Sequence, residues 1–162
     1  MIKMGSKFEV DDATGILMLS DKVGMTPEGG VAIKLVNKSG VNSVKGRMVE
    51  ASTAQDNAYD LTGAEDFQPI GVEYESGVAD GSECWVVIYG IAEVLLEDGT
   101  ASTHGYWVKT SDTQAGRADA SNAAPPGGTV TALEEHMREV GHCLEDKTSG
   151  TDVLAKIVMH FN

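Results

Sequence analysis

The sequence predicts a mostly β protein, a compact domain made from two similar β units with one short helix. Glycine is frequent, with 19 glycines in 162 residues, and turn signals recur about every ten residues, which is typical of all-β domains. The apolar runs between these turns have the length of strands rather than of helices. In addition, three blocks of the chain recur in the same order further along, which indicates an internal repeat.

Seven segments have the apolar pattern of strands. Residues 84–89 form the most apolar run, so we expect them to be the most buried strand. Residues 91–96 end in Glu97-Asp-Gly99, a turn in which glycine supplies a positive φ. The predicted strands are residues 31–36, 44–51, 70–75, 84–89, 91–96, 106–110 and 153–161.

One short helix is expected near residues 131–139. The segment Thr131-Ala-Leu-Glu134 fits a capping box, in which the hydroxyl caps the third amide and the glutamate reaches back. Leu133, Met137 and Val140 follow at helical spacing and would form one apolar face. Residues 115–129 precede the helix and are rich in proline and glycine, so they predict a long loop.

The internal repeat is the most informative feature of the sequence. The block at 45–52 recurs 59 residues later, and the blocks at 70–75 and 81–88 recur 70 and 69 residues later. The increase from 59 to 70 equals the extra length of the loop and helix in the second copy. We therefore expect a duplication, over about residues 45–96 and 104–161, that buries one shared core. Chance similarity among strands separated by glycine turns is the alternative.

Residues 1–30 have no counterpart in the repeat and are treated apart from a single β-rich domain over residues 31–162. The segment places Ile2, Met4, Phe8 and Val10 among polar residues. Two interpretations stay open. The segment forms the first strands of the fold, or it is an arm that becomes ordered on a partner.

Charge excludes several classes of partner. The chain has 12 basic and 25 acidic residues, a formal net charge of −13, so it lacks the cations that bind nucleic acid or anionic membranes. The uncharged stretch at 84–92 is far shorter than the ~20 residues of a membrane helix. The first residues are too polar for an export signal, so Cys84 and Cys143 are expected to be reduced thiols, although one disulfide is open to them.

No arrangement typical of catalysis or metal binding occurs. His136, His142 and Cys143 lack the spacing of zinc ligands, and adjacent residues on a strand point to opposite faces, so His142 and Cys143 cannot form a dyad. The acidic pairs lie beside turns or on the expected helix, as solvated carboxylates do. Phosphate-binding loops, calcium loops and nucleophile elbows are absent. We expect no enzyme, no catalytic residue, no metal and no cofactor.

The aromatic residues offer candidates for an interface. Trp85 lies in the most apolar strand and is expected in the core. Tyr106 and Trp107 are neighbours, so on a strand they face opposite ways and one of them can be exposed. An exposed aromatic side chain is a common anchor of protein interfaces, although a core position for both is the simpler interpretation.

The segment Pro69-Ile-Gly-Val through Cys84-Trp-Val-Val-Ile-Tyr-Gly resembles the capsid decoration proteins of tailed phages, which include the lambda-type head-stabilising class. Their pattern is an I-G-V strand, a glycine-containing turn and a V-x-V-x-G strand. Residues 140–162 look like a second copy, and the resemblance covers residues 30–162. The chain departs from the smallest members in its greater length and its inserted loop.

The resemblance implies a β-barrel or β-tulip-like fold and a structural role. A cement protein of this class is a late protein made in the bacterial cytoplasm. It binds the outside of the capsid as a homotrimer and stabilises contacts between major capsid proteins. Candidate capsid-binding residues are Ile2, Met4, Phe8 and Val10. Candidate residues for the trimer or another exposed interface are Tyr106, Trp107, Pro125 and Pro126.

Two further functions stay open at this point. One is a carbohydrate- or receptor-binding module of the virion that uses Tyr106, Trp107 and the long loop. The other is a structural component of the tail or connector.

Overall fold

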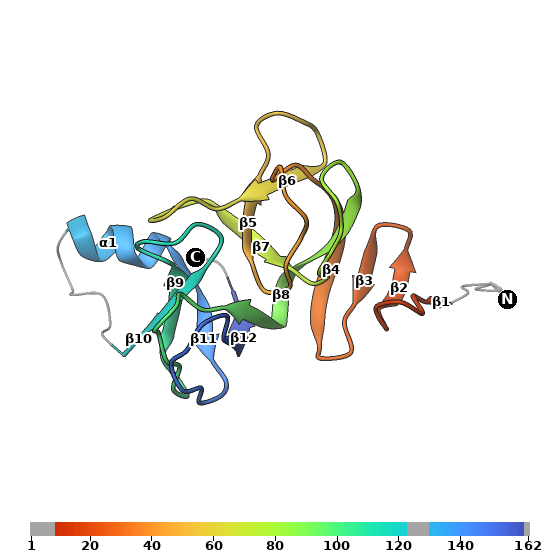
Figure 1. Ribbon diagram of the computed structural model, residues 1–162. Coiled ribbons are helices and arrows are strands. Elements are labelled where there is room, and N and C mark those ends of the chain that lie inside the picture. Colours follow the sequence, from red (N-terminus) through yellow and green to blue (C-terminus); the bar gives the residue numbers. More distant parts are fainter. Residues whose placement is uncertain (1–8, 123–129, 161–162) are drawn as a thin grey trace, which may run out of the picture.

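The computed structural model describes residues 9–122 and 130–160 (Figure 1). Nearly all its regular structure is β, as predicted. Its strands are β1 (Glu9–Val10), β2 (Leu17–Ser20), β3 (Val23–Met25), β4 (Gly30–Asn37), β5 (Met48–Ala51), β6 (Ala58–Leu61), β7 (Pro69–Glu73), β8 (Glu83–Leu95), β9 (Trp107–Thr110), β10 (Ala118–Ser121), β11 (Glu139–Cys143) and β12 (Leu154–Met159), and its helix is α1 (Val130–Met137).

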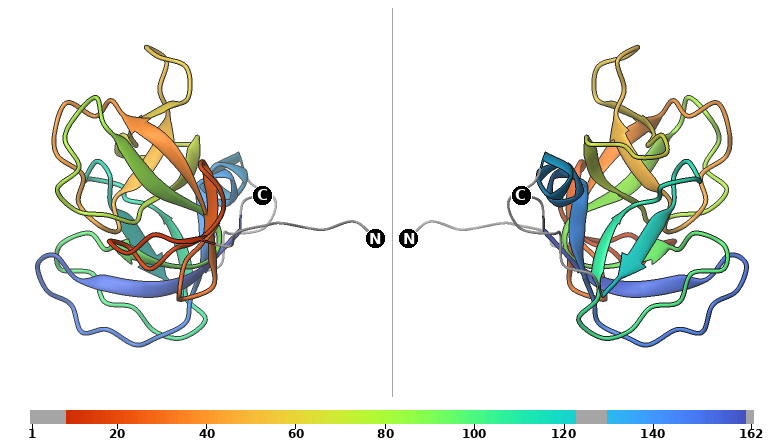
Figure 2. Two further views of the ribbon diagram at one scale, coloured as in Figure 1. Left: turned by 90° about the vertical axis from the view of Figure 1, so that its right-hand side faces the viewer. Right: turned by 90° about the vertical axis from the view of Figure 1, so that its left-hand side faces the viewer.

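These strands form one continuous sheet in the order β1-β2-β3-β4-β6-β5-β7-β8-β12-β11-β9-β10. An additional pairing between β4 and β8 closes the five strands from β4 to β8 into a barrel. The strands after the barrel extend the sheet from β8. In Figure 2 the barrel strands lie above the C-terminal strands.

Strand β8 belongs to both parts of the sheet. Residues 83–90 pair with β4, and residues 90–95 pair with β12. Gly90 stands at the junction with a φ of +83°, and a Cβ there would lie 2.6 Å from the carbonyl oxygen of Gly29. The two predicted strands 84–89 and 91–96 are therefore one strand, because Gly90 turns the backbone without ending the ladder. Figure 1 shows this strand in green, between the barrel and the C-terminal strands.

The two units of the predicted repeat have the same strand order. The first unit runs β6-β5-β7-β8 and the second runs β10-β9-β11-β12. Val49 pairs with Gly71 in the first unit, and Val108 pairs with Gly141 in the second. Both of these pairings are interrupted by a register shift at the same place, just beyond the glycine. The pairing thus matches the sequence alignment, while common descent of the two units stays a prediction.

Buried side chains from both units form one main core. Val72 and Val87 of the barrel belong to the same cluster as Val108 and Ile157 of the C-terminal strands. A smaller cluster of barrel residues contains Tyr59 and Cys84. Trp85 lies in the main core, as expected, and is almost fully buried.

Residues 9–30 are the first strands of the sheet rather than a separate arm. The strand β1 pairs with β2, β2 with β3, and β3 with β4 of the barrel. Ile16 is fully buried, and the indole Nε1 of Trp85 donates a hydrogen bond to Asp11 at 3.2 Å. This hydrogen bond lowers the pKa of Asp11. Residues 1–8, which hold Ile2, Met4 and Phe8, lie outside the described residues.

The helix and the loop differ in part from expectation. Helix α1 spans Val130–Met137, close to the predicted 131–139. However, Leu133 and Met137 are exposed rather than packed in the core, and Val140 is buried as part of β11. The predicted loop 115–129 contains β10, whose sequence Ala-Asp-Ala-Ser is too polar to be recognised as a strand. Residues 123–129, with Pro125 and Pro126, lie outside the described residues.

A buried carboxylate lies inside the barrel. Glu73 is 1% exposed, and it accepts hydrogen bonds from the Tyr59 hydroxyl at 2.6 Å and from the Val44 amide at 2.8 Å. Burial raises the pKa of Glu73, and these two donors oppose the rise. Burial and the neighbouring Glu73 also raise the pKa of Tyr59.

We predict that Gly90→Ala destabilises the protein more than Gly99→Ala. Both glycines have left-handed backbones, with φ of +83° and +87°, so alanine costs about 1–2 kcal/mol at either site. Only at position 90 does the new Cβ meet a backbone oxygen, and this overpacking adds about 1–3 kcal/mol. The measurement is the free energy of unfolding from denaturant titration. Equal losses in the two variants would show that the junction tolerates a side chain.

We predict a pH-dependent cost for Tyr59→Phe. Because the pKa of Glu73 is raised above its ordinary 4.5, the wild type already loses some stability as pH rises through that pKa. Without the hydroxyl donor the ionised carboxylate is less well solvated, so the variant loses about a further 1–3 kcal/mol at neutral pH and less at acid pH. Unfolding titrations at about pH 4 and about pH 8 measure the difference. The exposed Tyr89→Phe is the control, and a cost independent of pH would contradict the prediction.

Candidate functional site

Five apolar side chains form a row across the outer face of the N-terminal strands. The register pairs Val10 with Leu17, Leu17 with Met25, Met25 with Val31, and Val31 with Tyr89. Directly paired residues share one face of a sheet. All except the half-buried Val31 are exposed. We call these five residues the N-terminal apolar row.

The opposite face of the same strands turns inward. Met18 pairs with Gly24, and Gly24 with Ala32, and both Met18 and Ala32 pack in the main core. A Cβ on Gly24 would lie 2.3 Å from the Ile16 side chain, so the strands sit close over the core. The N-terminal apolar row is therefore surface that the fold leaves uncovered, although a complete core lies behind it.

Of the four predicted capsid-binding residues, Val10 is the one that the structure describes. It is 55% exposed and lies in β1, the end strand of the sheet order. Its apolar character and its position outside the repeat single out Val10 in the sequence. Its partners Leu17, Met25 and Tyr89 were missed because they come together only through the strand register.

The predicted interface residues Tyr106 and Trp107 face different surroundings. Tyr106 packs partly buried against the main core. Trp107 lies against two histidine rings, with ring centroids 4.9 Å from His142 and 6.0 Å from His136. Trp107 thus packs beside a group of imidazole rings.

Three histidines surround one buried carboxylate at the end of the C-terminal strands. Glu139 is 3% exposed. One of its oxygens lies 3.3 Å from Nε2 of His142 and 3.5 Å from Nε2 of His160, and the other lies 3.0 Å from Nδ1 of His136. We call Glu139, His142 and His160, with His136 beside them, the histidine cluster.

A β-bulge creates this cluster. Glu139 and His142 are three residues apart, so on a regular strand they would point to opposite faces. The register shift between Glu139 and Gly141 inserts one extra residue and brings both side chains to the same side, as bulges do. His160 arrives from the end of β12, where its amide donates to the carbonyl of Val140 at 3.0 Å.

The sequence pattern points to His136 and His142 but not to Glu139 or His160 as ligands of one site. Spacing along the chain could not reveal them, because the bulge and the β11–β12 pairing bring them together. One signal was present: the repeat aligns β11 and β12 with β7 and β8, which predicts their pairing. In that pairing His142 lies opposite Val158, and His160 follows Val158 by two residues.

Both cysteines are buried free thiols, as expected from the sequence. Cys143 lies in the main core while His142 faces outward, so the two adjacent residues do point to opposite faces. Burial raises the pKa of each thiol to about 11. Neither thiol is therefore a thiolate near neutral pH, and neither is suited to nucleophilic chemistry.

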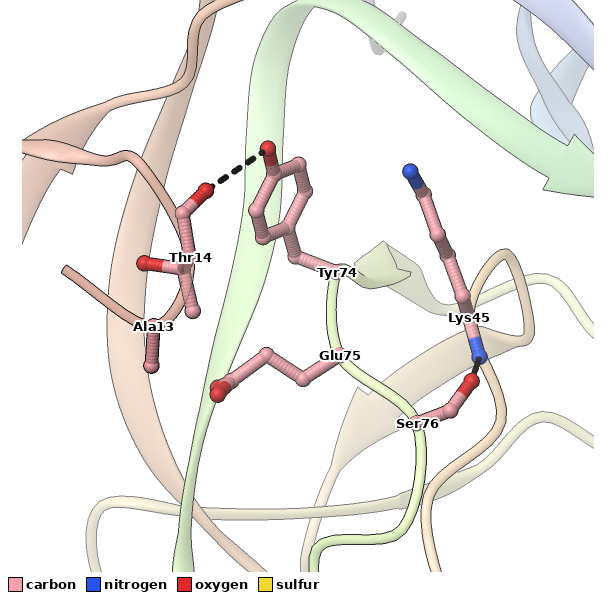
Figure 3. A pocket seen from close by; sticks show the side chains of 6 residues that line it. All are labelled: Ala13, Thr14, Lys45, Tyr74, Glu75 and Ser76. Atoms are coloured by element: carbon pink, nitrogen blue, oxygen red, sulfur yellow. Dashed lines mark hydrogen bonds between the residues drawn. The ribbon is translucent and has the colours of Figure 1, made fainter. Parts of the chain in front are cut away.

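A hollow of about 400 Å³ lies between the N-terminal strands and the barrel (Figure 3). Its lining residues are Ala13, Thr14, Lys45, Tyr74, Glu75 and Ser76.

The polar groups of this hollow already have partners. The Tyr74 hydroxyl donates to the carbonyl of Thr14 at 3.4 Å, and the Ser76 hydroxyl accepts from the Lys45 amide at 2.8 Å. The Lys45 ammonium pairs with Glu93 at 2.7 Å. Burial and the nearby Glu28 raise the pKa of Tyr74 to about 12. The hollow therefore joins the N-terminal strands to the barrel and does not present an activated nucleophile.

No helix among the described residues is long and apolar enough to cross a membrane. The chain matches no protein-family model. It also matches no curated protein in sequence.

The fold is similar to that of a solved structure, the N base of the head fiber gp8.5 in bacteriophage phi29. The two share 17% sequence identity with a TM-score of 0.51, and the match covers 80% of this chain and 92% of that chain. At this identity the similarity establishes a common fold.

Proposed function

We propose that this protein is a structural component of a tailed-phage virion. In this proposal it binds the outer surface of the capsid as a homotrimer and stabilises contacts between major capsid proteins. It is a cement protein of the decoration class. The observation that carries the proposal is the fold shared with a phage head fiber base over 80% of the chain.

The N-terminal apolar row supports this role. A row of large apolar side chains left in water is typical of a surface that binds a partner. Each such side chain contributes about 1.5–3 kcal/mol when it becomes fully buried. The row also begins at β1, the end strand among the described residues, where a partner strand can extend the sheet. A capsid protein that offers an apolar strand edge fits both features.

The net charge of −13 supports a position outside the shell. An acidic surface repels packaged nucleic acid and keeps an abundant protein soluble. Like charges also repel the copies from one another. We therefore expect contacts with partners to use apolar patches of the surface, of which this row is one. We propose no catalytic role, since the polar groups that line the hollow already have hydrogen-bond or ion-pair partners.

We predict that Val10→Asp weakens binding to capsids while Val41→Asp does not. The two valines are similarly exposed, at 55% and 47%, but only Val10 belongs to the N-terminal apolar row. A charge in a buried apolar contact should lower capsid affinity at least about tenfold. The assay is co-sedimentation with undecorated capsids of the phage that encodes the chain. Both variants should melt within about 2 °C of the wild type, because each change lies on the surface.

Normal binding by Val10→Asp would move the contact to another surface. Binding to glycans without binding to shells would favour the receptor-binding alternative. Immunogold labelling of the tail or connector rather than the head would favour a component of those parts.

We also predict a homotrimer. Light scattering coupled to size exclusion should give a mass of about three times 17.1 kDa, at least at high concentration, because association by mass action stabilises a domain with a small core. A monomer in solution that forms trimers on the shell agrees with the proposal. A monomer in both places contradicts it.

A further inference from the structure

The histidine cluster has the composition of a transition-metal site. Its donors are two Nε2 atoms and one carboxylate oxygen, which are ligand types that Zn²⁺ and its neighbours in the first transition row prefer. The three donor atoms, from Glu139, His142 and His160, lie within 4.8 Å of one another. No other group of this kind occurs among the residues that the structure describes.

The distances between these donors fit a bound ion. A tetrahedral Zn²⁺ with bonds of about 2.0–2.1 Å holds its ligand atoms about 3.3–3.4 Å apart. The Glu139 oxygen lies 3.3 Å from Nε2 of His142 and 3.5 Å from Nε2 of His160. The two imidazole nitrogens are separated by no more than 4.8 Å, so small side-chain rotations bring all three donors into range.

The fold holds these donors in place. Glu139 and His142 lie on β11, which is paired on both sides by β9 and β12. The ring of His142 packs against Trp107 at 4.9 Å and against His160 at 5.1 Å. Ligands on paired strands with packed rings are preorganised, which lowers the cost of binding.

The burial of the cluster and the charge of the protein also suit a cation site that solvent can reach. The carboxylate is buried, but the His142 and His160 side chains are 35% and 34% exposed, so an ion can enter from solvent. The protein carries a net charge of −13, which favours the approach of a cation. His136, with Nδ1 3.0 Å from the second carboxylate oxygen, is a further imidazole beside the site.

We propose that Glu139, His142 and His160 bind a divalent transition-metal ion, with Zn²⁺ as the ion that the geometry fits best. The ion joins the bulged strand β11 to the residue after β12, close to helix α1. It therefore acts as a cross-link that stabilises the pairing of the C-terminal strands. This replaces the expectation, drawn from spacing along the chain, that no metal binds.

The test is titration of the purified full-length protein with ZnCl₂ after treatment with EDTA and dialysis. Isothermal titration calorimetry should show one site per chain. At a free Zn²⁺ concentration of about 100 times Kd, the melting temperature should rise by several degrees. Co²⁺ should give the visible absorption bands of a four-coordinate ion, which report the ligand geometry independently of stability.

The variants His142→Ala and His160→Ala should each lower Zn²⁺ affinity at least about tenfold. His104→Ala is the matched control, because His104 pairs with Asp146 on an exposed turn away from the cluster. Its affinity should equal that of the wild type. Since His160 follows β12 and is part exposed, His160→Ala should keep the far-ultraviolet circular dichroism of the metal-free wild type.

Two results would overturn the proposal. The first is absence of Zn²⁺ and Co²⁺ binding by the folded wild type, which would make the cluster a hydrogen-bonded group of imidazoles around a carboxylate. The second is an equal loss of affinity in His104→Ala and His160→Ala, which would indicate nonspecific binding to surface histidines.

Discussion

The whole sheet depends on strand β8 running unbroken through two environments. Its first half closes the barrel against β4, and its second half carries the C-terminal strands through β12. At Gly90 the strand changes direction without ending, because glycine tolerates the left-handed φ there. A side chain at this position would collide with the Gly29 carbonyl. The main core contains residues from both parts, so the path of β8 also sets how their side chains meet.

Each of the two units has a register shift beside a glycine, and a buried acid lies near that glycine. Gly71 and Gly141 occupy corresponding positions beside the same register shift. In the first unit the neighbouring buried acid is Glu73, which is satisfied inside the barrel by Tyr59 and Val44. In the second unit the buried acid is Glu139, which lies two residues before its glycine rather than two after it, and it meets partly exposed imidazoles. A bulge that the fold needs for its shape thus supplies the geometry of a candidate metal site.

Two surfaces lie on different strands of the sheet. At the N-terminal end, the strands that cover the core present apolar side chains to water, from Val10 to Tyr89. Among the C-terminal strands, β11 and β12 bring histidines together beside an exposed part of helix α1. The first surface is suited to a protein partner and the second to a cation, so the proposed capsid contact and the proposed metal site can be tested separately.

The sequence by itself determined the β class, the short helix, the burial of Trp85 and the acidic net charge. These follow from local composition and periodicity, which act over a few residues. Tertiary structure decided what depends on register: that residues 83–95 are one strand, that Val10 aligns with Leu17 and Met25, and that Glu139 meets His160. Pairing between distant strands and a single bulged residue set these contacts, and neither is encoded in spacing along the chain.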